Sequence, residues 1–600
     1  MKRTLSLALT LTALLAGAAA AHAQARAYTP AQRAADSTQA LAFFRGNIAA
    51  IHRRDRPAYL RHYLQSPRLA RVGPGGVAYG YQPMAAPRDS TWPDTLVATH
   101  FEVVPLSPGV VYGAYRYRVA QGGGSSRGVS ERVMARQPDG SWKVGVSTAF
   151  GSPGDAPVPA FALTHATVID GTGRPPLRDA TVVMRDGKVA CVGACTVAAD
   201  VEVVDARGRW IVPGLVDAHV HYSQTGWADG RPDALDLRDR FPYDSTVAVL
   251  EAHPERFFRS YLCAGVTATF DVGGYPWTWA LRRRAEASNA APHVAAAGPL
   301  LSTLDHWLNV PAARQFVFMG SDSATLAGAR MMVHNGSDAV KVWYLVESTS
   351  PDTAQFKARL RVAAAEARRG GIPLIVHATD LWQARDALRA GARLLVHSVD
   401  DQPVDDEFIA LAKQAGATYT PTLTVTDGYG MLLGRRFDRA GIPLECVDPD
   451  TRHRAALTDS LPPDPRFTPE VMARYRQRAA TLRQTMYANL RRVRDAGIPI
   501  AMGTDAGNPL TLHGASVYRE MEAMAEAGMT PMEVLVASTR TAARAMGRAD
   551  IGTLEPGKLA DLVVLDGDPL ASVANLRRVR LVARGGEIWT REELEYPAER

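Results

Sequence analysis

Cysteine is scarce in this chain. Only four cysteines occur in 600 residues: Cys191, Cys195, Cys263 and Cys446. A chain of this size with so few cysteines does not depend on a disulfide framework for its core. Cys191 and Cys195 are close enough in sequence to pair locally, but two free, buried thiols agree with the spacing equally well. The same spacing is that of half a zinc site, yet no second half follows, so we assign no metal to them.

Long apolar runs and clusters of one charge are also missing. Beyond the N-terminus, no apolar run reaches the roughly 18 residues that a membrane-spanning helix requires. The net charge of +7 is modest, and no basic stripe is interleaved with aromatic residues. These absences argue against membrane and nucleic-acid partners, and they leave a homo-oligomer open. The 46% hydrophobic content indicates a globular chain, with roughly three or four domain-sized units for its length.

The first 23 residues have the pattern of a signal peptide. Lys2 and Arg3 precede the apolar run LSLALTLTALLAGAAAA, and Ala21-His22-Ala23 matches an A-x-A cleavage site. We predict cleavage after Ala23, and no cysteine follows the cut to carry a lipid anchor. The mature protein is therefore expected to be periplasmic or secreted.

Residues 27–152 form the first predicted domain. TQALAFFRGNIAAIHRRDRPAYLRHYL has helical periodicity, and alternating runs such as VYGAYRYRVA predict strands. The PDG turn in SERVMARQPDGSWKVGVSTAF joins two such runs into a hairpin. A helix followed by a curved antiparallel sheet resembles the cone-shaped α+β fold of SnoaL-like (nuclear-transport-factor-like) domains. That resemblance implies a pocket or a dimerisation module, and SPGDAPVPA is the predicted linker after it.

A second predicted domain is split in the sequence. Short β runs separated by turns fill residues 160–213, and similar runs fill residues 550–592. We expect both pieces to form one small β-sandwich, with the intervening chain as a separate domain. Two unrelated β flaps are the simpler alternative.

The chain between these pieces, residues 214–549, repeats one pattern. A helical stretch ends at a glycine, and an apolar strand begins two or three residues later, as in LRAGARLLVHSV and RDAGIPIAMGTDAG. Alternating strands and helices imply parallel β/α units. Eight candidate strands occur, the number of a closed (β/α)8 barrel, whose chemistry sits at the C-terminal strand ends. The predicted fold class is therefore α/β: a (β/α)8 TIM barrel with a split β-sandwich, preceded by the α+β domain.

Polar residues recur at the predicted strand ends. His219 and His221 in GLVDAHVH are two residues apart, so both point to one face of a strand. Lys341 lies inside the apolar strand AVKVW, where an unpaired lysine is costly. Other strands end with His377 in LIVHAT, His397 in LLVHSV and Asp505 in AMGTDAG.

Each of these residues has a simpler interpretation when taken alone. The histidines agree with hydrogen-bonded core residues, Asp505 with a helix cap, and Lys341 with an amine that reaches solvent. Gathered on one barrel rim, however, neutral imidazoles and a carboxylate are suited to sharing metal ions. The set as a whole therefore predicts a metal centre.

These motifs resemble the amidohydrolase superfamily, and within it the imidazolonepropionase-like and zinc-dependent prolidase-like group. The resemblance covers roughly residues 160–590 and rests on PGLVDAHVH, DAVKV, VHA, VHS, GTDAG and GTLEPGKLADLVVLD, in that order. It implies that His219 and His221 bind one metal, and that His377 and His397 bind a second. It further implies that Lys341, carboxylated by carbon dioxide, bridges both metals, while Asp505 binds the first metal and transfers protons.

The implied cofactors are two divalent metal ions, with zinc favoured because imidazole and carboxylate ligands suit it. Manganese and cobalt stay open. Carboxylation would turn a buried cation into an anion that offsets two dications. Two metals about 3.5–4 Å apart can share a hydroxide and polarise a carbonyl.

Further residues are secondary candidates. Tyr344 follows the lysine strand and would polarise a substrate carbonyl, with barrel packing as the alternative. His513 in LTLHGAS lies just after Asp505 and would contact substrate. Glu520 and Glu522 open a helix near the site. His306 lies where the resembling group often has a Gly-Gly-His segment that this chain lacks. The segment from Tyr429 to Pro469 has few regular signals, and a loop of this length often forms a lid or a specificity element.

The predicted function is that of an exported, dinuclear metal-dependent amidohydrolase that uses a metal-bridged hydroxide. Its substrates would be small molecules or peptides with an amide bond: small peptides, N-acyl amino acids or cyclic amides. The same hydroxide attacks lactones and phosphotriesters, so a lactonase or phosphotriesterase is the alternative. A deaminase usually needs only one metal, so Lys341, which would bridge two metals, argues against a deaminase. A ligand-capture protein without catalysis is a third, less favoured interpretation.

Overall fold

The computed structural model describes residues 28–73, 76–86, 95–121, 124–153, 160–199, 201–305 and 313–596. The predicted signal peptide, most of the predicted linker and His306 lie outside these ranges. The chain divides into two compact units: Met1–Gln121 with Ser126–Ala156, and Gly122–Ser125 with Pro157–Arg600. None of the helices in the described part of the chain combines the length and the apolarity needed to cross a membrane.

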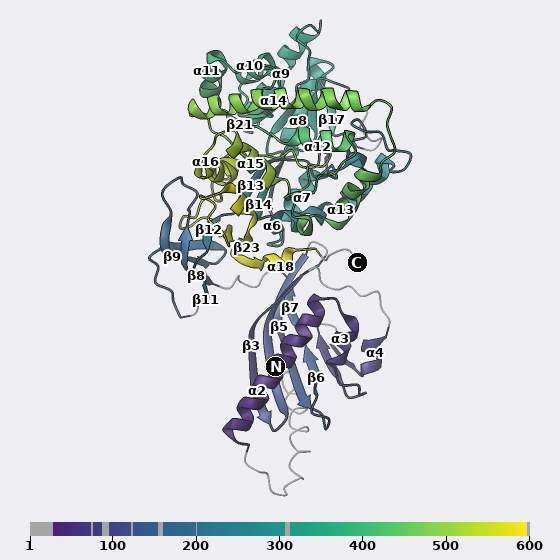
Figure 1. Ribbon diagram of the computed structural model, residues 1–600, viewed down its shortest axis with the longest axis vertical. Helices are drawn as coiled ribbons and strands as arrows, with labels where there is room; N and C mark the ends of the chain where they lie inside the picture. The colour runs from purple at the N-terminus through teal and green to yellow at the C-terminus, as the bar shows by residue number, and fades with distance from the viewer. Residues whose placement is uncertain are drawn as a thin grey trace. The chain divides into compact units, whose positions relative to one another are not determined.

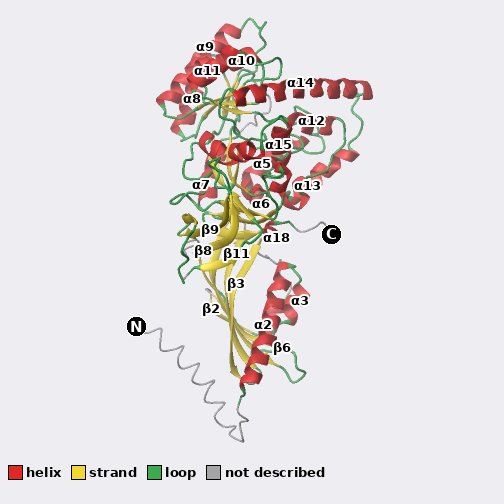
Figure 2. Cartoon of the chain, turned by 60° about the vertical axis from the view of Figure 1, so that its left-hand side comes forward, coloured by secondary structure: helices red, strands yellow, loops and turns green. Residues whose placement is uncertain are grey.

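The first unit is a long helix packed on a mostly antiparallel sheet. Helix α2 (Pro30–His52) starts with a capping box formed by Thr29 and Gln32, so its first free N–H groups are satisfied. Figure 2 shows α2 lying along the sheet, and Phe44 of α2 packs with Tyr115, Met134 and other strand residues in the core. The sheet order is β2-β1-β6-β5-β4-β3, with β7 paired to β5. The elements are α3 (Arg56–Arg61), α4 (Tyr81–Ala85), β1 (Ala70–Gly73), β2 (Gly76–Tyr79), β3 (Thr95–Ser107), β4 (Val110–Gln121), β5 (Gly124–Arg136), β6 (Trp142–Thr148) and β7 (Phe150–Pro153).

The second unit contains a sheet built from two distant parts of the sequence. Its order is β10-β9-β8-β12-β22-β23-β24, with β11 paired to β8. The two sequence pieces meet where β12 pairs antiparallel with β22, from Trp210 opposite Leu565 to Pro213 opposite Leu562. The strands are β8 (Phe161–Val168), β9 (Leu177–Arg185), β10 (Lys188–Gly193), β11 (Glu202–Asp205), β12 (Trp210–Pro213), β22 (Leu562–Leu565), β23 (Val579–Arg584) and β24 (Glu587–Thr590).

Parallel strands alternate with helices through the rest of the second unit (Figure 1). One parallel sheet has the order β13-β14-β15, and the other has the order β17-β16-β18-β19-β20-β21. Their bounds are β13 (Leu215–Val220), β14 (Val266–Asp271), β15 (His293–Ala296), β16 (Leu300–Ser302), β17 (Phe316–Phe318), β18 (Val340–Trp343), β19 (Leu374–His377), β20 (Leu394–Val396) and β21 (Thr418–Thr420). The helices are α5 (Tyr243–Ala252), α6 (Phe258–Cys263), α7 (Thr278–Glu286), α8 (Asp322–His334), α9 (Thr353–Arg369), α10 (Leu381–Ala390), α11 (Asp406–Ala415), α12 (Val425–Leu433), α13 (Pro449–Ala456), α14 (Pro469–Asp495), α15 (Val517–Glu526), α16 (Pro531–Val536), α17 (Ala542–Ala545) and α18 (Arg591–Leu594).

Hydrogen bonds connect these two sheets at two places. Asp338, just before β18, donates its N–H to the Ala296 carbonyl at the end of β15 (3.0 Å). At the second place, the segment that contains Ile500 bridges β21 at Tyr419 and reaches β13, where Ala218 donates to the Met502 carbonyl (3.0 Å). This segment is the eighth predicted strand, and it is extended without being a full strand. These parallel strands, taken in chain order, are consistent with a TIM-barrel domain.

The segment from Tyr429 to Pro469 differs from the expected irregular loop. It contains the end of α12, the short helix α13 and two 3-10 turns, Leu444–Cys446 and Leu457–Ser460. Phe437, Val447 and Ala455 are buried in a hydrophobic cluster with Trp227. The apolar side chains of this segment therefore form a small core together with distant parts of the chain, and the sequence of the segment alone did not reveal it.

All four cysteines are paired. Cys191 pairs with Cys195 beside β10, which resolves the choice that the sequence left open. Cys263, at the end of α6, pairs with Cys446 across 183 residues. The second disulfide ties the segment after α12 to the parallel-sheet region.

Candidate metal centre

All six predicted metal ligands line one cavity of about 300 Å³. His219 and His221 come from the end of β13, and Lys341 comes from β18. The other ligands are His377, the last residue of β19, His397, directly after β20, and Asp505, after the Ile500 segment. The parallel strands thus deliver these side chains to one place, as the sequence predicted.

His219 and His221 both lie close to one carboxylate oxygen of Asp505. Oδ1 of Asp505 lies 2.9 Å from Nε2 of His221 and 3.2 Å from Nε2 of His219. Nδ1 of His221 lies 2.6 Å from the Gly273 carbonyl, so this nitrogen must donate a proton. In a neutral ring, Nε2 of His221 then presents a lone pair to the lone pairs of Asp505. A proton on Nε2 or a cation held by both atoms would relieve this repulsion, and the donor set of two imidazoles and a carboxylate fits a zinc-like ion.

The second pair of histidines lies beside the first. The ring centroids of His377 and His397 are 4.3 Å apart, and those of His219 and His397 are 4.9 Å apart. Nδ1 of His397 lies 2.8 Å from Oγ1 of Thr422, which fixes the ring. Nε2 of His377 is buried and has no hydrogen-bond partner among the described residues. The lone pair of this buried nitrogen is therefore available to a metal ion.

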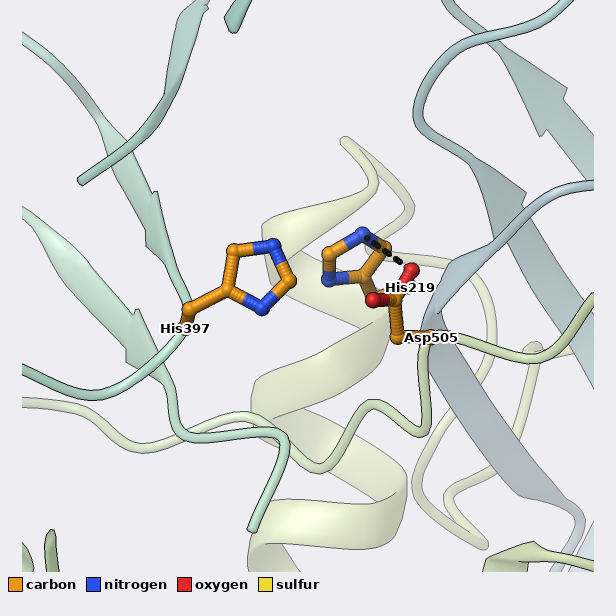
Figure 3. A group of neighbouring side chains, drawn as sticks. All are labelled: His219, His397 and Asp505. Carbon is orange, nitrogen blue, oxygen red and sulfur yellow. Dashed lines mark ion pairs between the residues drawn. The ribbon is translucent and has the colours of Figure 1, made fainter. Parts of the chain in front are cut away.

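Three of these residues meet a geometric condition for holding one ion. Ligand atoms of His219, His397 and Asp505 all lie within 4.8 Å of one another (Figure 3). Burial lowers the pKa of His219 to about 4, and burial also holds the pKa of His377 and His397 well below its usual range. The rings are therefore uncharged at neutral pH, the state in which imidazole binds a metal.

Lys341 is the most unusual member of the set. It is 2% exposed and makes no hydrogen bond or ion pair with any described residue. Burial lowers the pKa of its amine to about 7, against a smaller opposing effect of Asp505. A substantial share of the amine is therefore uncharged near neutral pH, and an uncharged amine is the form that can react with carbon dioxide.

Local backbone features hold the ligands in place. The Asp217 carboxylate accepts hydrogen bonds from the N–H and the hydroxyl of Thr504 (3.0 and 2.6 Å), which ties β13 to the segment before Asp505. A Cβ on Gly503 would lie 2.8 Å from the His219 Cβ, so only glycine fits there. His397 and Asp505 have positive φ angles of 75° and 63°. Strained residues of this kind are often found at functional sites.

The cavity has two chemically different walls. One wall is apolar and includes Leu300, Phe316 and Trp343, with the Phe316 and Trp343 rings 5.1 Å apart. The other wall is polar: Arg231 donates to the Asn508 side-chain oxygen, which also accepts the Tyr429 hydroxyl (2.7 Å). Sequence reasoning missed both walls. The run of buried residues around Arg231, in TGWADGRPD, has no periodicity that could have revealed it.

Tyr344 and His513 lie outside this cavity lining. Tyr344 is buried with its ring 6.0 Å from that of Trp382, and its hydroxyl has no partner in the described part of the chain. Nε2 of His513 donates to the Gln224 carbonyl (2.9 Å), and its Nδ1 accepts from the Tyr261 hydroxyl (2.7 Å). Both ring nitrogens of His513 are therefore already used.

The two glutamates of α15 have different surroundings. Glu520 is buried, and its carboxylate accepts the backbone N–H groups of Leu423 and Thr424 (2.8 and 3.0 Å) directly after β21. Glu522 instead pairs with Arg577. Glu520 thus supports the chain that leads from Thr422, the partner of His397.

Comparison with known proteins agrees with this geometry. The model of the amidohydrolase family matches residues 210–588. An imidazolonepropionase of Mycolicibacterium smegmatis is 26% identical over 72% of this chain and 96% of its own length. One from Paracoccus denitrificans is 48% identical over 14% of this chain and 22% of its own length. The match to this relative, and to two other imidazolonepropionases, covers about a quarter of the relative's own length.

Solved structures give the same result for the fold. A Xaa-Pro dipeptidase structure with bound methionine has a TM-score of 0.55 and 21% identity, covering 72% of this chain and all of that one. Molinate hydrolase, with a TM-score of 0.54 and 23% identity, covers 74% of this chain and 99% of its own. These likenesses show a shared mixed α/β fold, and the family match confirms the prediction from the motifs. The chain belongs to the amidohydrolase family, a family of hydrolases that act on carbon–nitrogen bonds.

Proposed function

We propose that this protein is a dinuclear metal-dependent hydrolase that cleaves the amide bond of small peptides, N-acyl amino acids or cyclic amides. The observation that carries the proposal is the convergence of six side chains from five separate segments on one cavity, where buried ring nitrogens of His219 and His377 have no hydrogen-bond partner among the described residues. Family membership and the full-length likeness to an imidazolonepropionase support it.

The residues divide into two sets of ligands. His219, His221 and Asp505 would hold one metal, and His377 and His397 the other, with a carboxylated Lys341 shared between them. The metals, when bound, supply Lewis acidity toward a carbonyl and lower the pKa of water. Zinc suits this donor set best.

Asp505 is suited to moving the proton during hydrolysis. Its Oδ1 is buried beside the two imidazoles and faces the cavity. As water adds to the substrate carbonyl carbon, this oxygen would take one proton from the water. It would then return the proton to the amine nitrogen as the carbon–nitrogen bond breaks, leaving a carboxylic acid and an amine. Meanwhile Leu300, Phe316 and Trp343 would exclude bulk water from one side of the reacting bond.

We also propose the finer features of architecture and location. The hydrogen bonds that join the two parallel sheets support a closed (β/α)8 barrel, and the helix-on-sheet first unit supports a SnoaL-like domain. Two disulfides and the N-terminal sequence support export, because disulfides persist in oxidising compartments. If the protein is exported as proposed, N-terminal sequencing of the mature form finds Gln24 first. A mature form that retains residues 1–23 contradicts export.

One experiment tests the proposed function. Metal content is measured by elemental analysis, and the protein is assayed before and after chelator treatment and zinc restoration. The substrates are dipeptides, N-acetyl amino acids and a cyclic amide, with a lactone and a phosphotriester as comparison. We expect two metals per chain and amide hydrolysis that disappears on chelation and returns with zinc. Faster hydrolysis of the lactone or the phosphotriester than of every amide would overturn the substrate assignment.

A further inference from the structure

A second cavity adjoins the metal centre. It has a volume of about 820 Å³ and lies between α12, α14 and α15, while the metal cavity has about 300 Å³. In Figure 1, α14 is the long helix that crosses the second unit, and α12 lies close to it. Among the described residues, Thr426 and Tyr475 are the two that line both cavities. They therefore form the partition between the metal centre and the larger space.

The partition depends on a single aromatic ring. Tyr475 projects from α14, and its hydroxyl donates to the Thr426 carbonyl in the first turn of α12 (3.0 Å). Its ring packs closely on α12, because a Cβ added at Gly430 would lie 3.1 Å from it. Glycine at position 430 thus allows the ring to lie close against α12. The hydrogen bond at one end and this contact along the ring hold Tyr475 between the two cavities.

The outer cavity has many charged side chains in its lining, but their charges balance. Four arginines and four carboxylates line it, and pairs such as Arg483 with Asp427 neutralise each other. Tyr487 also donates to Glu526 (3.0 Å). Small residues of α14, Ala479 and Ala480, leave the space beyond Tyr475 open. A neutral surface with many hydrogen-bonding groups fits an uncharged peptide main chain better than an anion or a lipid tail.

We propose that Tyr475 is the residue that limits substrate size. By closing the side of the metal cavity that faces the outer cavity, it would restrict the enzyme to substrates that fit about 300 Å³. Without its ring, the outer cavity would accept the continuation of a longer peptide. This inference rests on the proposed function, because it assumes that the substrate binds at the metal centre. It names a specificity residue that belongs to neither the ligand set nor its immediate supports.

The test compares a short and a long ligand of the same metal-binding chemistry. Acetohydroxamate and a triglycine-extended hydroxamate are titrated into the zinc-loaded protein by calorimetry, for wild type, Tyr475→Ala and Tyr475→Phe. In Tyr475→Ala we expect the affinity of the long ligand relative to the short one to rise by about tenfold or more. Tyr475→Phe keeps the ring and should leave the ratio within about twofold of wild type.

A second variant guards against misfolding as an explanation. Ala479 lies one helical turn after Tyr475 and lines the outer cavity. Adding Ala479→Trp to Tyr475→Ala refills that space, so the gain for the long ligand should disappear while zinc content and melting temperature stay unchanged. An unchanged ratio in Tyr475→Ala, or an equal change in Tyr475→Phe, would overturn the proposal.

The outcome is separable from the proposed function. Hydroxamate binding needs the metal centre but no turnover, and amide hydrolysis is measured in parallel. If wild type binds acetohydroxamate but hydrolyses no amide, the proposed function fails while the role of Tyr475 is still tested. If the affinities do not respond to Tyr475→Ala while amides are hydrolysed, only the role of Tyr475 fails.

Discussion

Lys341 differs from the other candidate ligands because a lysine amine is ordinarily charged and solvated, whereas this one is buried. A lysine amine that is 2% exposed, with no described partner, has no structural reason to be buried. We expect Lys341→Ala to lower the bound metal from two ions to one or none per chain, and to reduce kcat/KM by at least about 100-fold, more than the loss of an indirect support does. Elemental analysis and steady-state kinetics check this.

A matched lysine provides the control for this prediction. Lys188 begins β10 with an exposed side chain, and Lys188→Ala should leave metal content and activity unchanged. Added acetate offers a second check, since a small carboxylate can occupy the space that Lys341→Ala vacates and restore part of the activity. Two metals retained in Lys341→Ala would contradict the bridging role.

His513 is expected to stabilise the fold and to bind no metal. Its two nitrogens hold the Gln224 carbonyl and the Tyr261 hydroxyl, and its ring stacks on Phe257 with centroids 3.8 Å apart. His513→Ala leaves these buried groups unpaired, which costs about 1–3 kcal/mol for each. Thermal unfolding should show a lower melting temperature, with metal content unchanged. His219→Ala is the comparison, and it should lose metal.

That the six candidate ligands line one cavity could be predicted, because each lies in a short local pattern: a strand, its end and one polar residue. The contacts of His513 could not, since Tyr261 lies 252 residues away. For the same reason the sequence did not reveal Arg231 beside Asn508, 277 residues apart. Tyr344 lies outside the cavity lining. It comes directly after β18, and the four-residue strand pattern does not specify to which side the next side chain points.

At the scale of elements, a buried ionic cluster joins the parallel strands to the split sheet. His293 of β15 lies 2.9 Å from Glu286, at the end of α7, and 3.0 Å from Asp561, just before β22. Arg584 of β23 and Arg548 also face the imidazole (3.1 and 3.5 Å). Burial lowers the pKa of His293, but Asp561 and Glu286 outweigh this effect, and the net pKa is raised.

This cluster predicts how stability depends on pH. A raised pKa means that folded His293 keeps its proton after the unfolded chain has lost it. The stabilisation is complete below the unfolded pKa of about 6.5 and is lost as the pH rises through the folded pKa. We expect the melting temperature to fall over that range in wild type. In His293→Gln this fall should be absent, as measured by calorimetry from pH 5 to pH 9. An identical slope in both proteins would exclude His293 as its source.

The elements themselves were mostly predictable, with informative exceptions. A repeated pattern, in which a helix ends at a glycine and an apolar strand follows, indicated the parallel strands. This pattern was readable because the end of a helix and the start of a strand depend on neighbouring residues. The eighth strand is only an extended segment, since its neighbours supply isolated bridges at Tyr419 and Val220. The segment after α12 was misread as a loop. Its core forms against Trp227, far away in the sequence, and no local periodicity records such a partner.

At the scale of the whole molecule, the two disulfides close loops of very different length. Cys191–Cys195 spans 4 residues and Cys263–Cys446 spans 183. A longer closed loop restricts the unfolded chain more. The chain-entropy model therefore assigns about 5 kcal/mol to the long crosslink and about 2 kcal/mol to the short one. Removing the short crosslink is therefore a control within the same chain for removing the long one.

We therefore expect Cys263→Ala/Cys446→Ala to lower the melting temperature more than Cys191→Ala/Cys195→Ala does. The long crosslink anchors the segment that packs on Trp227, next to the chain that carries Arg231 into the metal cavity. Its loss should therefore also raise KM, whereas the short crosslink lies beside β10 in the split sheet and should leave KM unchanged. Calorimetry and kinetics on both double variants decide this. Equal losses of stability would mean that the long crosslink adds no constraint beyond that of the packed segment.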